Sequence, residues 1–355
     1  MGNIQVIVVL GSDMEGRILP IVVSVVPTYN EEDWIERCLL SLLTQTYPKE
    51  RHRIHIVDGG STDSTLDIVR RIKKENESIS ITILENPQRR VPHARNLSLR
   101  NMTDDVELVF EVNAHGWVPD DHLEKRVIDL LEIESNLGFQ IAGVGCRVVP
   151  YDEEQVGLFG RWVESTLSCP LGSGDGQFAR FSGRHPHKIP AFVIHRIKAL
   201  HDAQGWDETL PTNQDSDLSM RLIKRGWQLW RSDISSFHMV KRRKPLEFVR
   251  MCRRYGFWRT KTLFRHGSRF NFREFLPMFG VILTATMFLS GFEYWYAPLI
   301  AYGLAILQVG FMEAIRGKDS SLIIGVPFLL PILHSMFTIG LFEGIIRRSL
   351  DINDR

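Results

Sequence analysis

The chain has 355 residues with 43 basic and 42 acidic side chains, which gives a formal net charge of +1. Hydrophobic residues make up 44% and charged residues 24%, a composition that excludes a disordered chain and is ordinary for a globular one. The charge is unevenly placed. Residues 241–273, here called the basic collar, hold twelve Lys and Arg and one acid, whereas residues 275–346 hold only six charges. This split excludes a purely soluble protein and predicts a soluble body, a basic collar and an apolar tail that enters a membrane.

The N-terminus and the cysteines indicate where the body resides. The apolar run Ile4–Leu10 is too short to span a membrane and lacks the basic residues that begin a signal peptide. The four cysteines are far apart and form no CxxC pair, which argues against a disulfide framework or a zinc ribbon and favours a reducing compartment. We therefore expect the body to stay in the cytosol.

From residue 21 the chain alternates between short apolar runs and helical periodicity. The continuous run Ile21–Val26 is rich in β-branched residues, which is typical of a strand buried on both faces, and a helix is predicted from about residue 35. The alternation predicts a doubly wound, mostly parallel α/β sheet with helices on both faces. Further strands are predicted at 54–57, 79–84, 106–112 and 141–149, and further helices from about 63 and at 92–101, 119–134 and 153–167.

Three of these predicted strands end in polar turns. The turns read TYNE at 28–31, DGGSTD at 58–63 and NAH at 113–115. Helix capping explains any one of them, because Gly, Ser, Asp and Asn are the usual residues where a strand leads into a helix. Ligands of doubly wound sheets bind outside the carboxyl ends of the strands, so three such turns together predict a ligand site.

Four stretches carry a family resemblance. They are VVPTYNEE (25–32), VDGGSTDST (57–65), VPHARNLSL (91–99) and NQDSDLSMRLIKRG (213–226), in that order. Together they resemble the inverting glycosyltransferases of family 2, which have the GT-A nucleotide-sugar-binding fold, from about residue 21 to 265. RRYGFWRTKTLFRH (253–266) and the apolar tail after it are similar to the branch typified by succinoglycan-biosynthesis enzymes. GxGxxG is absent where a dinucleotide-binding protein needs it, which argues against a dehydrogenase.

A nucleotide-sugar needs directional hydrogen bonds to its base and neutralisation of its diphosphate. Asp58, at a strand tip beside two glycines, can accept a hydrogen bond from a uracil N3–H. The resemblance implies that role, with Thr28 beside the base and Glu31 on the ribose. Arg95 can bind a phosphate with two parallel N–H groups, and the alternative is a surface ion pair. Asp63 is expected to cap the following helix. The resemblance favours a UDP-sugar and implies a binding set of Pro27, Thr28, Tyr29, Glu31, Asp58, Arg95 and Asn96.

The resemblance also implies a divalent metal, Mn²⁺ or Mg²⁺, bound by Asp-x-Asp after the fourth strand. Here that stretch reads Asn113-Ala114-His115, which leaves the metal open. Amide oxygen and imidazole nitrogen can both ligate a metal but bring no charge, and the mixed set suits Mn²⁺ better than Mg²⁺. His238 is a further candidate for a metal or phosphate contact, the alternative being a hydrogen-bonded structural histidine. The predicted metal set is therefore Asn113, His115 and His238.

An inverting transfer needs a carboxylate that takes the proton from the attacking hydroxyl. By resemblance Asp215 holds the position of this base, and Gln214 replaces the acid that usually precedes it. Helix capping explains Asp217. The Gly-rich segment 171–183 is predicted to be an acceptor loop, the alternative being a disordered surface excursion. The predicted acceptor-binding set is Gln214, Arg180, Arg254 and Trp258.

Three uncharged runs follow the basic collar, at 275–292, 294–312 and 322–342. Each is near the ~20 residues that cross a hydrocarbon core. Basic residues interleaved with aromatic ones directly before a span fit a lipid surface better than a nucleic acid, and they place the collar on the cytoplasmic side. The third run contains Pro327 and Pro331, and a third span would export Arg347 and Arg348 against the positive-inside rule. A re-entrant or surface-lying third segment therefore stays open.

The predicted organisation is an N-terminal extension (1–20), a GT-A domain (21–240), a basic amphipathic juxtamembrane region (241–274), two or three transmembrane or re-entrant helices (275–346) and a tail (347–355). The predicted protein is a multi-pass enzyme of the cell membrane with its catalytic domain on the cytoplasmic face. It transfers a sugar, with inversion, from a nucleotide-sugar to a lipid-linked saccharide in polysaccharide or glycan assembly. One alternative is a polyprenyl-phosphate glycosyl synthase, and another is a catalytically silent nucleotide-binding membrane scaffold.

Overall fold

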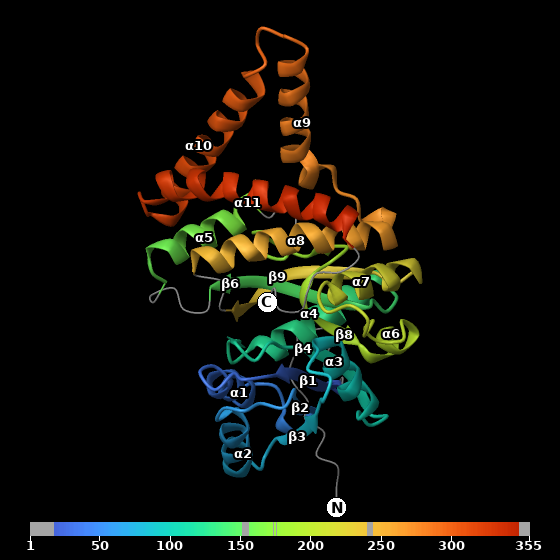
Figure 1. The fold of residues 1–355 in the computed structure, drawn as a ribbon. Coiled ribbons are helices and arrows are strands. Elements are labelled where there is room, and N and C mark those ends of the chain that lie inside the picture. Colours follow the sequence, from blue (N-terminus) through green and yellow to red (C-terminus); the bar gives the residue numbers. More distant parts are fainter. Residues whose placement is uncertain (1–17, 151–155, 173, 175, 240–243, 348–355) are drawn as a thin grey trace, which may run out of the picture. The chain divides into compact units, whose positions relative to one another are not determined.

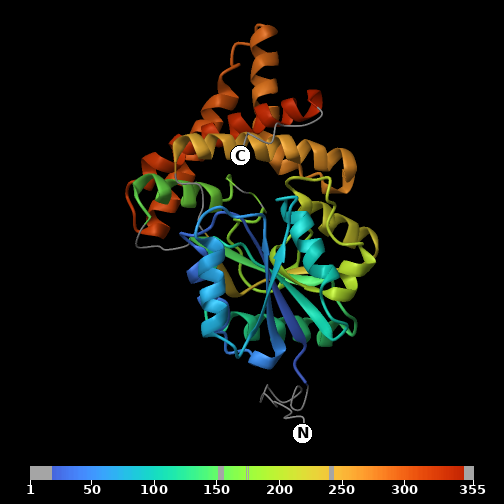
Figure 2. The same cartoon turned by 60° about the horizontal axis from the view of Figure 1, so that its bottom comes forward.

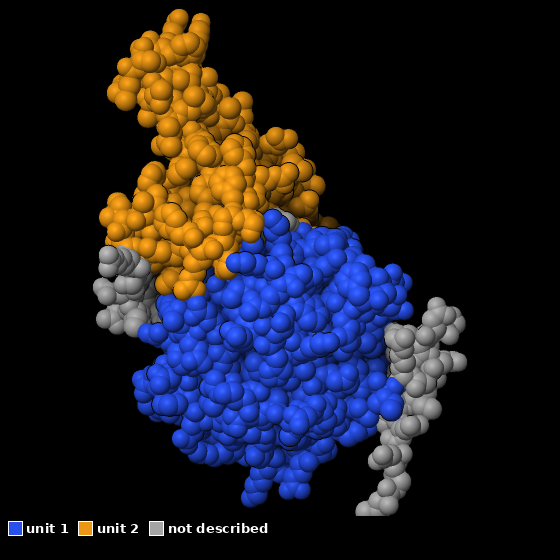
Figure 3. All heavy atoms as spheres, turned by 90° about the vertical axis from the view of Figure 1, so that its right-hand side faces the viewer, with its two compact units in different colours: residues 1–149, 182–239 blue, residues 150–181, 240–355 orange. Residues whose placement is uncertain are grey.

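The computed structural model describes residues 18–150, 156–172, 174, 176–239 and 244–347. They belong to two compact units, distinguished by colour in Figure 3: unit 1 comprises residues 1–149 and 182–239, and unit 2 comprises residues 150–181 and 240–355. Several predicted features lie outside the described residues. They are nearly all of the N-terminal extension, the start of the helix expected at 153–167, the boundary between 240 and 241, and Arg348 with the residues after it.

Within the described residues, unit 1 holds a nine-stranded mixed sheet of order β3-β2-β1-β4-β8-β6-β9-β5, with β7 paired to β9. Its first half is parallel and comprises β3 (Ser80–Glu85), β2 (His52–Asp58), β1 (Ile21–Thr28) and β4 (Val106–Glu111). In its second half, β8 (Ala191–Arg196) is antiparallel to β4 and β6 (Gly143–Pro150), and β9 (Leu229–Met239) is antiparallel to β5 (Gly116–Trp117) and β7 (His185–Pro186). The α/β prediction is confirmed, but only the first half of the sheet is parallel.

Helices cover both faces of this sheet because alternate residues of a strand point to opposite sides. Val22 and Val26 of β1 pack with α1 (Ile35–Leu43), α2 (Thr65–Glu75) and α4 (His122–Leu137). Val23 and Val25 pack instead with α3 (Val91–Arg100), α6 (Ile197–Asp202) and α7 (Gln214–Lys224). Figure 2 shows the strands between these two groups of helices. The prediction that residues 21–26 form a strand buried on both faces is therefore confirmed.

Unit 2 is helical in the part of the chain that the structure describes. It contains α5 (Leu158–Ser168), α8 (Pro245–Arg265), α9 (Leu276–Leu289), α10 (Ala297–Gly317) and α11 (Leu322–Ile346), labelled in Figure 1, with the short 3-10 turns η2 (Gly267–Arg269) and η3 (Phe272–Phe275). Three segments are long and apolar enough to cross a membrane: Phe272–Leu289, Ala297–Gly317 and Leu322–Ile346. They coincide with the three predicted apolar runs.

The last of these helices, α11, packs closely against α8. A Cβ added at Gly340 would lie 2.0 Å from the carbonyl oxygen of Arg253, so only glycine permits this approach. The Arg253 guanidinium donates to both carboxylate oxygens of Glu343, at 2.8 and 3.0 Å. By contrast, α9 buries none of its residues. Of the three membrane-length segments in the described residues, α11 is therefore the most buried within the protein.

Candidate active site

The turns that follow β1 and β2 are joined by hydrogen bonds. The backbone N–H of Asn30 donates to Ser61 Oγ at 3.0 Å, and the N–H of Thr62 donates to Asn30 Oδ1 at 2.8 Å. The N–H of Glu31 donates to Thr65 Oγ1 at 2.8 Å. Asn30 has φ +52°, a left-handed conformation that Asn tolerates better than most residues. The turn after β4 joins them, because His115 Nδ1 lies 3.0 Å from Glu31 Oε1. The three polar turns therefore meet at one edge of the sheet.

Asp58 organises the turn after β2. Its Oδ2 accepts the N–H groups of Gly60 and Ser61 at 2.8 and 3.0 Å, and its Oδ1 accepts the Ser61 hydroxyl. A carboxylate has about four lone-pair directions, so one more donor, such as a base N–H, fits the same group. Thr28 is directly adjacent, since its carbonyl accepts the Gly59 N–H at 2.8 Å. Asp63 accepts the Thr65 N–H at 3.0 Å from the position just before Ser64, the N-cap residue of α2.

Tyr29 stands exposed beside this turn, and Pro27 belongs to β1, in register with Val57. The guanidinium carbon of Arg89 lies 5.2 Å from the centre of the Tyr29 ring. Arg89 also lies close to Gly60, whose added Cβ would be 3.8 Å from Arg89 Nη2. The sequence analysis missed Arg89, because nothing in the motif before α3 indicates that this side chain folds back over the glycines.

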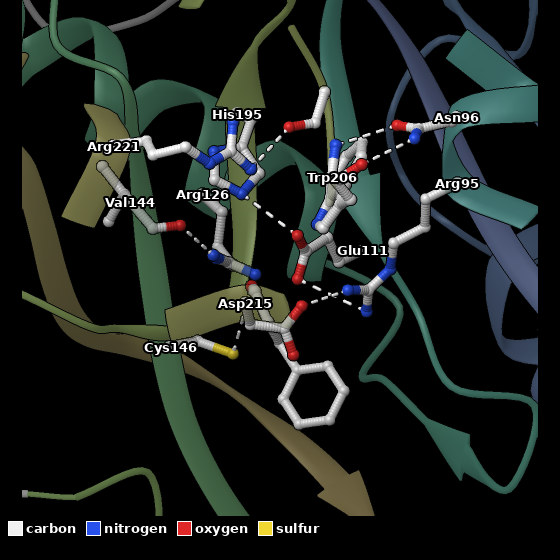
Figure 4. Close-up of polar contacts among 12 residues, drawn as sticks. Arg95, Asn96, Glu111, Arg126, Val144, Cys146, His195, Trp206, Asp215 and Arg221 are labelled. Carbon is white, nitrogen blue, oxygen red and sulfur yellow. Dashed lines mark hydrogen bonds and ion pairs between the residues drawn. The ribbon is translucent and has the colours of Figure 1, made fainter. Parts of the chain in front are cut away.

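The central polar network surrounds Arg95 in α3 (Figure 4). Its guanidinium forms an ion pair with Asp215 at the start of α7 and lies 3.5 Å from Glu111 Oε2 at the end of β4. Glu111 Oε1 is in turn 3.1 Å from His195 Nε2 on β8. Arg95, Glu111 and His195 are buried, whereas 48% of the Asp215 side chain is accessible to solvent. One edge of an otherwise buried network of charges is therefore exposed at Asp215.

The charges of this network shift the acidities of its carboxyl groups. Burial acts to raise the pKa of Glu111, but Arg95 and His195 outweigh it and hold that pKa below its ordinary value. The protein atoms around the Asp215 carboxylate desolvate it and raise its pKa, an effect that Arg95 opposes and Glu111 adds to. The two carboxylates are therefore shifted in opposite directions, Glu111 towards a lower pKa and Asp215 towards a higher one. The sequence analysis missed the roles of Glu111 and His195, because their contact joins residues 84 positions apart.

Asn96, the neighbour of Arg95, is held by a loop. Its side-chain amide donates to the Trp206 carbonyl at 2.7 Å and to Glu208 Oε1 at 3.0 Å, and its oxygen accepts the Trp206 N–H at 2.8 Å. The adjacent Gly205 has φ +68°, and its added Cβ would lie 2.3 Å from Asn96 Oδ1. The structure therefore gives Asn96 a positioning role, and its contact with a nucleotide stays a prediction.

Each of the three predicted metal ligands contacts another side chain, and their joint binding of an ion stays a prediction. The side-chain N–H of Asn113 donates a hydrogen bond to Met239 Sδ at 3.6 Å. The His238 ring stacks on the Trp117 ring with 3.9 Å between their centroids. No group of three or more His, Cys, Asp or Glu able to hold a metal occurs among the described residues. His115 and Glu31 do form a partly exposed pair of one nitrogen and one oxygen donor. This pair fits a divalent ion only if a ligand, such as a diphosphate, supplies the remaining donors.

The predicted acceptor residues fall in different units. Gln214 starts α7 in unit 1, and its buried Oε1 has no hydrogen-bond partner among the described residues. Arg180 lies in unit 2, where it forms an ion pair with the buried Glu313 of α10. Arg254 and Trp258 belong to α8 of the same unit. Only Gln214 is therefore placed beside the Arg95 network by the geometry of unit 1. Helix α7 begins at Gln214, with Asn213 as its N-cap. Asp217 therefore lies within the helix, and the prediction that it caps the helix is wrong.

Comparisons with known proteins find relatives that are named as glycan-assembly enzymes. Residues 24–155 match the family described as Glycosyl transferase family 2. The chain is 26% identical to the dolichyl N-acetyl-alpha-D-glucosaminyl phosphate 3-beta-D-2,3-diacetamido-2,3-dideoxy-beta-D-glucuronosyltransferase of Methanococcus voltae, over 91% of this chain and 96% of that protein. It is 27% identical to the succinoglycan biosynthesis protein ExoA of Rhizobium meliloti (strain 1021), over 79% of this chain and 84% of that protein.

A solved structure supports the fold. The mannosyltransferase PcManGT from Pyrobaculum calidifontis, in complex with GDP-Man and Mn²⁺, superposes with a TM-score of 0.59 and 20% identity, covering 93% of this chain and 88% of that one. The fold is therefore of the GT-A type. The match of residues 24–155 to the family 2 model and the two named relatives support a glycosyltransferase.

Proposed function

We propose that the chain transfers a sugar from a nucleotide-sugar to a hydroxyl of a lipid-linked saccharide, with inversion, and that Asp215 is the catalytic base. The observation that carries this proposal is the half-exposed Asp215 carboxylate above the buried Arg95 and Glu111. The exposure of this carboxylate lets an acceptor approach it. Desolvation, which raises its pKa, makes it a stronger base, and Arg95 opposes that shift.

In this mechanism Asp215 accepts the proton of the acceptor hydroxyl while that oxygen attacks the anomeric carbon. The bond between the anomeric carbon and the diphosphate oxygen breaks, and the nucleoside diphosphate leaves with the bonding electrons. Attack from the face opposite the leaving group inverts the anomeric centre. Arg95 orients Asp215 and keeps it ionised until the proton is transferred.

The donor is proposed to bind at the three joined turns. Asp58 and Thr28 are placed to meet the base, and Glu31 to meet the ribose. Arg89, over Gly60 and Tyr29, is an additional cation for the diphosphate. A UDP-sugar is favoured because the free acceptor direction on Asp58 suits a uracil N3–H.

A divalent ion is proposed to accompany the donor, as Mn²⁺ accompanies GDP-Man in the Pyrobaculum enzyme. Glu31 and His115 would hold it, and Asn113 can join them, because its contact with a thioether is weak. When bound, such an ion neutralises charge that develops on the leaving diphosphate.

The acceptor is proposed to be lipid-linked, for two reasons. The Methanococcus relative is named for a dolichyl-phosphate-linked sugar that it extends, and three helices of this chain are long and apolar enough to cross a membrane. We further propose that the catalytic domain faces the cytoplasm. Cysteines introduced in the basic collar should then resist a membrane-impermeant label applied to intact cells, and a cysteine replacing Glu293 should react. Labelling of the collar would contradict this orientation.

The function is tested with purified full-length protein, a panel of nucleotide-sugars and a membrane lipid extract. Mass spectrometry should detect one hexose-class addition to a glycolipid. A sugar added instead to a bare polyprenyl phosphate would support the second candidate, the polyprenyl-phosphate glycosyl synthase. Absence of any lipid-linked product with every donor would contradict both.

A further inference from the structure

Two arginines share one carboxylate where α8 leads into α9. Arg259 of α8 places its Nε 3.0 Å from Glu274 Oε2, and Arg269 of η2 places its Nη2 3.4 Å from Glu274 Oε1. The three side chains are only 18%, 12% and 13% exposed, respectively. All three residues lie in unit 2. Arg259 and Arg269 precede the first membrane-length apolar segment (Phe272–Leu289), and Glu274 lies near its start.

This cluster has more positive charge and more donors than it uses. One carboxylate faces two guanidinium groups, so the cluster carries a net charge of +1. Three donor atoms, Arg259 Nε and Nη1 and Arg269 Nε, are buried and have no hydrogen-bond partner among the described residues, and the same holds for the acceptor Glu274 Oε2. Burial lowers the pKa of Arg259 to about 10, which still leaves it protonated at neutral pH. Buried charges without hydrogen bonds are costly unless a counter-ion satisfies them.

The surroundings indicate which counter-ion fits. Exposed aromatic side chains flank the cluster: Phe270 stacks on Phe275 with 5.1 Å between centroids, and Phe272 stacks on Phe279 with 5.4 Å. Phe270 and Phe272 are 53% and 56% exposed. Exposed aromatics next to an apolar helix are typical of the membrane–water interface, which is the depth of lipid phosphates. A planar guanidinium matches phosphate oxygens in a bidentate geometry.

We propose that Arg259 and Arg269 form a binding site for the phosphoryl group of a membrane lipid. The site lies outside the proposed catalytic network and would hold the lipid at the start of α9. It rests on the proposed function only in requiring that the chain meets a membrane. Binding is measured without turnover, so a failure here is distinguishable from a failure of the proposed transfer.

The test uses full-length protein in an uncharged detergent and native mass spectrometry. The probes are a polyprenyl phosphate, phosphatidylglycerol and, as the uncharged control, the corresponding polyprenol. Arg259→Gln should weaken binding of the polyprenyl phosphate by roughly tenfold, which is the effect of losing one charge-assisted contact. Arg273→Gln is the matched control, because it removes the same charge from an exposed position next to the cluster. It should change that affinity by less than about twofold.

A second variant keeps the proposal falsifiable if Arg259→Gln fails to fold. Glu274→Gln removes the competing carboxylate, so it should tighten binding of the phosphate-bearing lipids by roughly threefold or more, a gain that unfolding cannot produce. Preference for the polyprenyl phosphate would identify the lipid as the acceptor, and equal binding of phosphatidylglycerol would identify a bulk-lipid headgroup; either result supports the site. Equal losses in Arg259→Gln and Arg273→Gln, or weaker binding in Glu274→Gln, would overturn it.

Discussion

The guanidinium of Arg95 forms an ion pair with the carboxylate of Asp215, which lies 120 positions later in the chain. The pair joins α3 to α7 on the same face of the sheet, and Arg95 also faces the buried Glu111. Arg95 therefore pairs with the carboxylate of this network that is half exposed to solvent.

Removing that cation should shift the pH dependence of the reaction. Arg95 lowers the pKa of Asp215, so Arg95→Met should raise it, and Asp215 must be ionised to act as a base. The acid limb of the kcat profile should therefore move to higher pH by about one unit, the lower end of the effect of a neighbouring opposite charge. Arg53→Met, which breaks the surface pair with Asp105, is the control and should leave the limb in place. An unshifted limb in folded Arg95→Met would contradict the coupling.

Nucleotide binding should depend on Asp58. Asp58→Asn removes one charged acceptor from the turn after β2, so UDP affinity measured by calorimetry should fall by about 1–3 kcal/mol. Asp105→Asn is a matched control, because Asp105 precedes β4 at the opposite edge of the parallel strands and pairs with Arg53. Unchanged affinity in a folded Asp58→Asn protein would remove Asp58 from the site.

A chelator should abolish transfer, and added Mn²⁺ should restore it, if Glu31 and His115 hold an ion with the donor. Asn113→Asp should then lower the Mn²⁺ concentration needed for half-maximal activity, because a charged oxygen replaces a neutral one. The control is Asn101→Asp, which makes the same change at the C-terminal end of α3. Full activity in excess chelator would refute the metal proposal and leave Arg89 and Arg95 as the cations for the diphosphate.

Acid should destabilise the fold through His52. Its Nε2 is hydrogen-bonded to Ser24 Oγ at 2.8 Å, and burial lowers its pKa from 6.5 to about 3. Between these two values the unfolded chain binds a proton that the folded chain does not, so stability falls as pH falls from 6.5 towards 3, by up to about 1.4 kcal/mol per unit. His52→Asn should reduce this slope in thermal unfolding measured at pH 7 and pH 5. The exposed His201→Asn should not, and equal slopes in all three proteins would contradict the assignment.

The sequence allowed much of the parallel half of the sheet to be predicted, because local patterns determine it. The run at Ile21–Val26 is apolar on both faces, and polar turns mark the strand ends. In the antiparallel half only β6 was predicted, as the strand at 141–149. The strand β9 was missed because it mixes polar and apolar residues (LWRSDISSFHM), and no turn signal pairs it with β5 or β7. The Glu111–His195 contact was likewise missed, since the strands that carry it are neighbours only in the folded sheet. The motif resemblance identified Asp215 and Arg95 as candidate site residues. Their ion pair could be recognised only from the tertiary structure.

The most direct test of the proposed function is the turnover of Asp215→Asn with a glycolipid acceptor. Asparagine keeps the size and hydrogen bonding of the side chain but cannot accept the hydroxyl proton, so kcat should fall by about 10²–10⁴-fold with nucleotide affinity little changed. Asp217→Asn, which breaks a pair with Arg221 in the same helix at 2.8 Å, should lower thermal stability more than kcat. A folded Asp215→Asn protein with near-normal turnover on a glycolipid would contradict the assignment of Asp215 as the base.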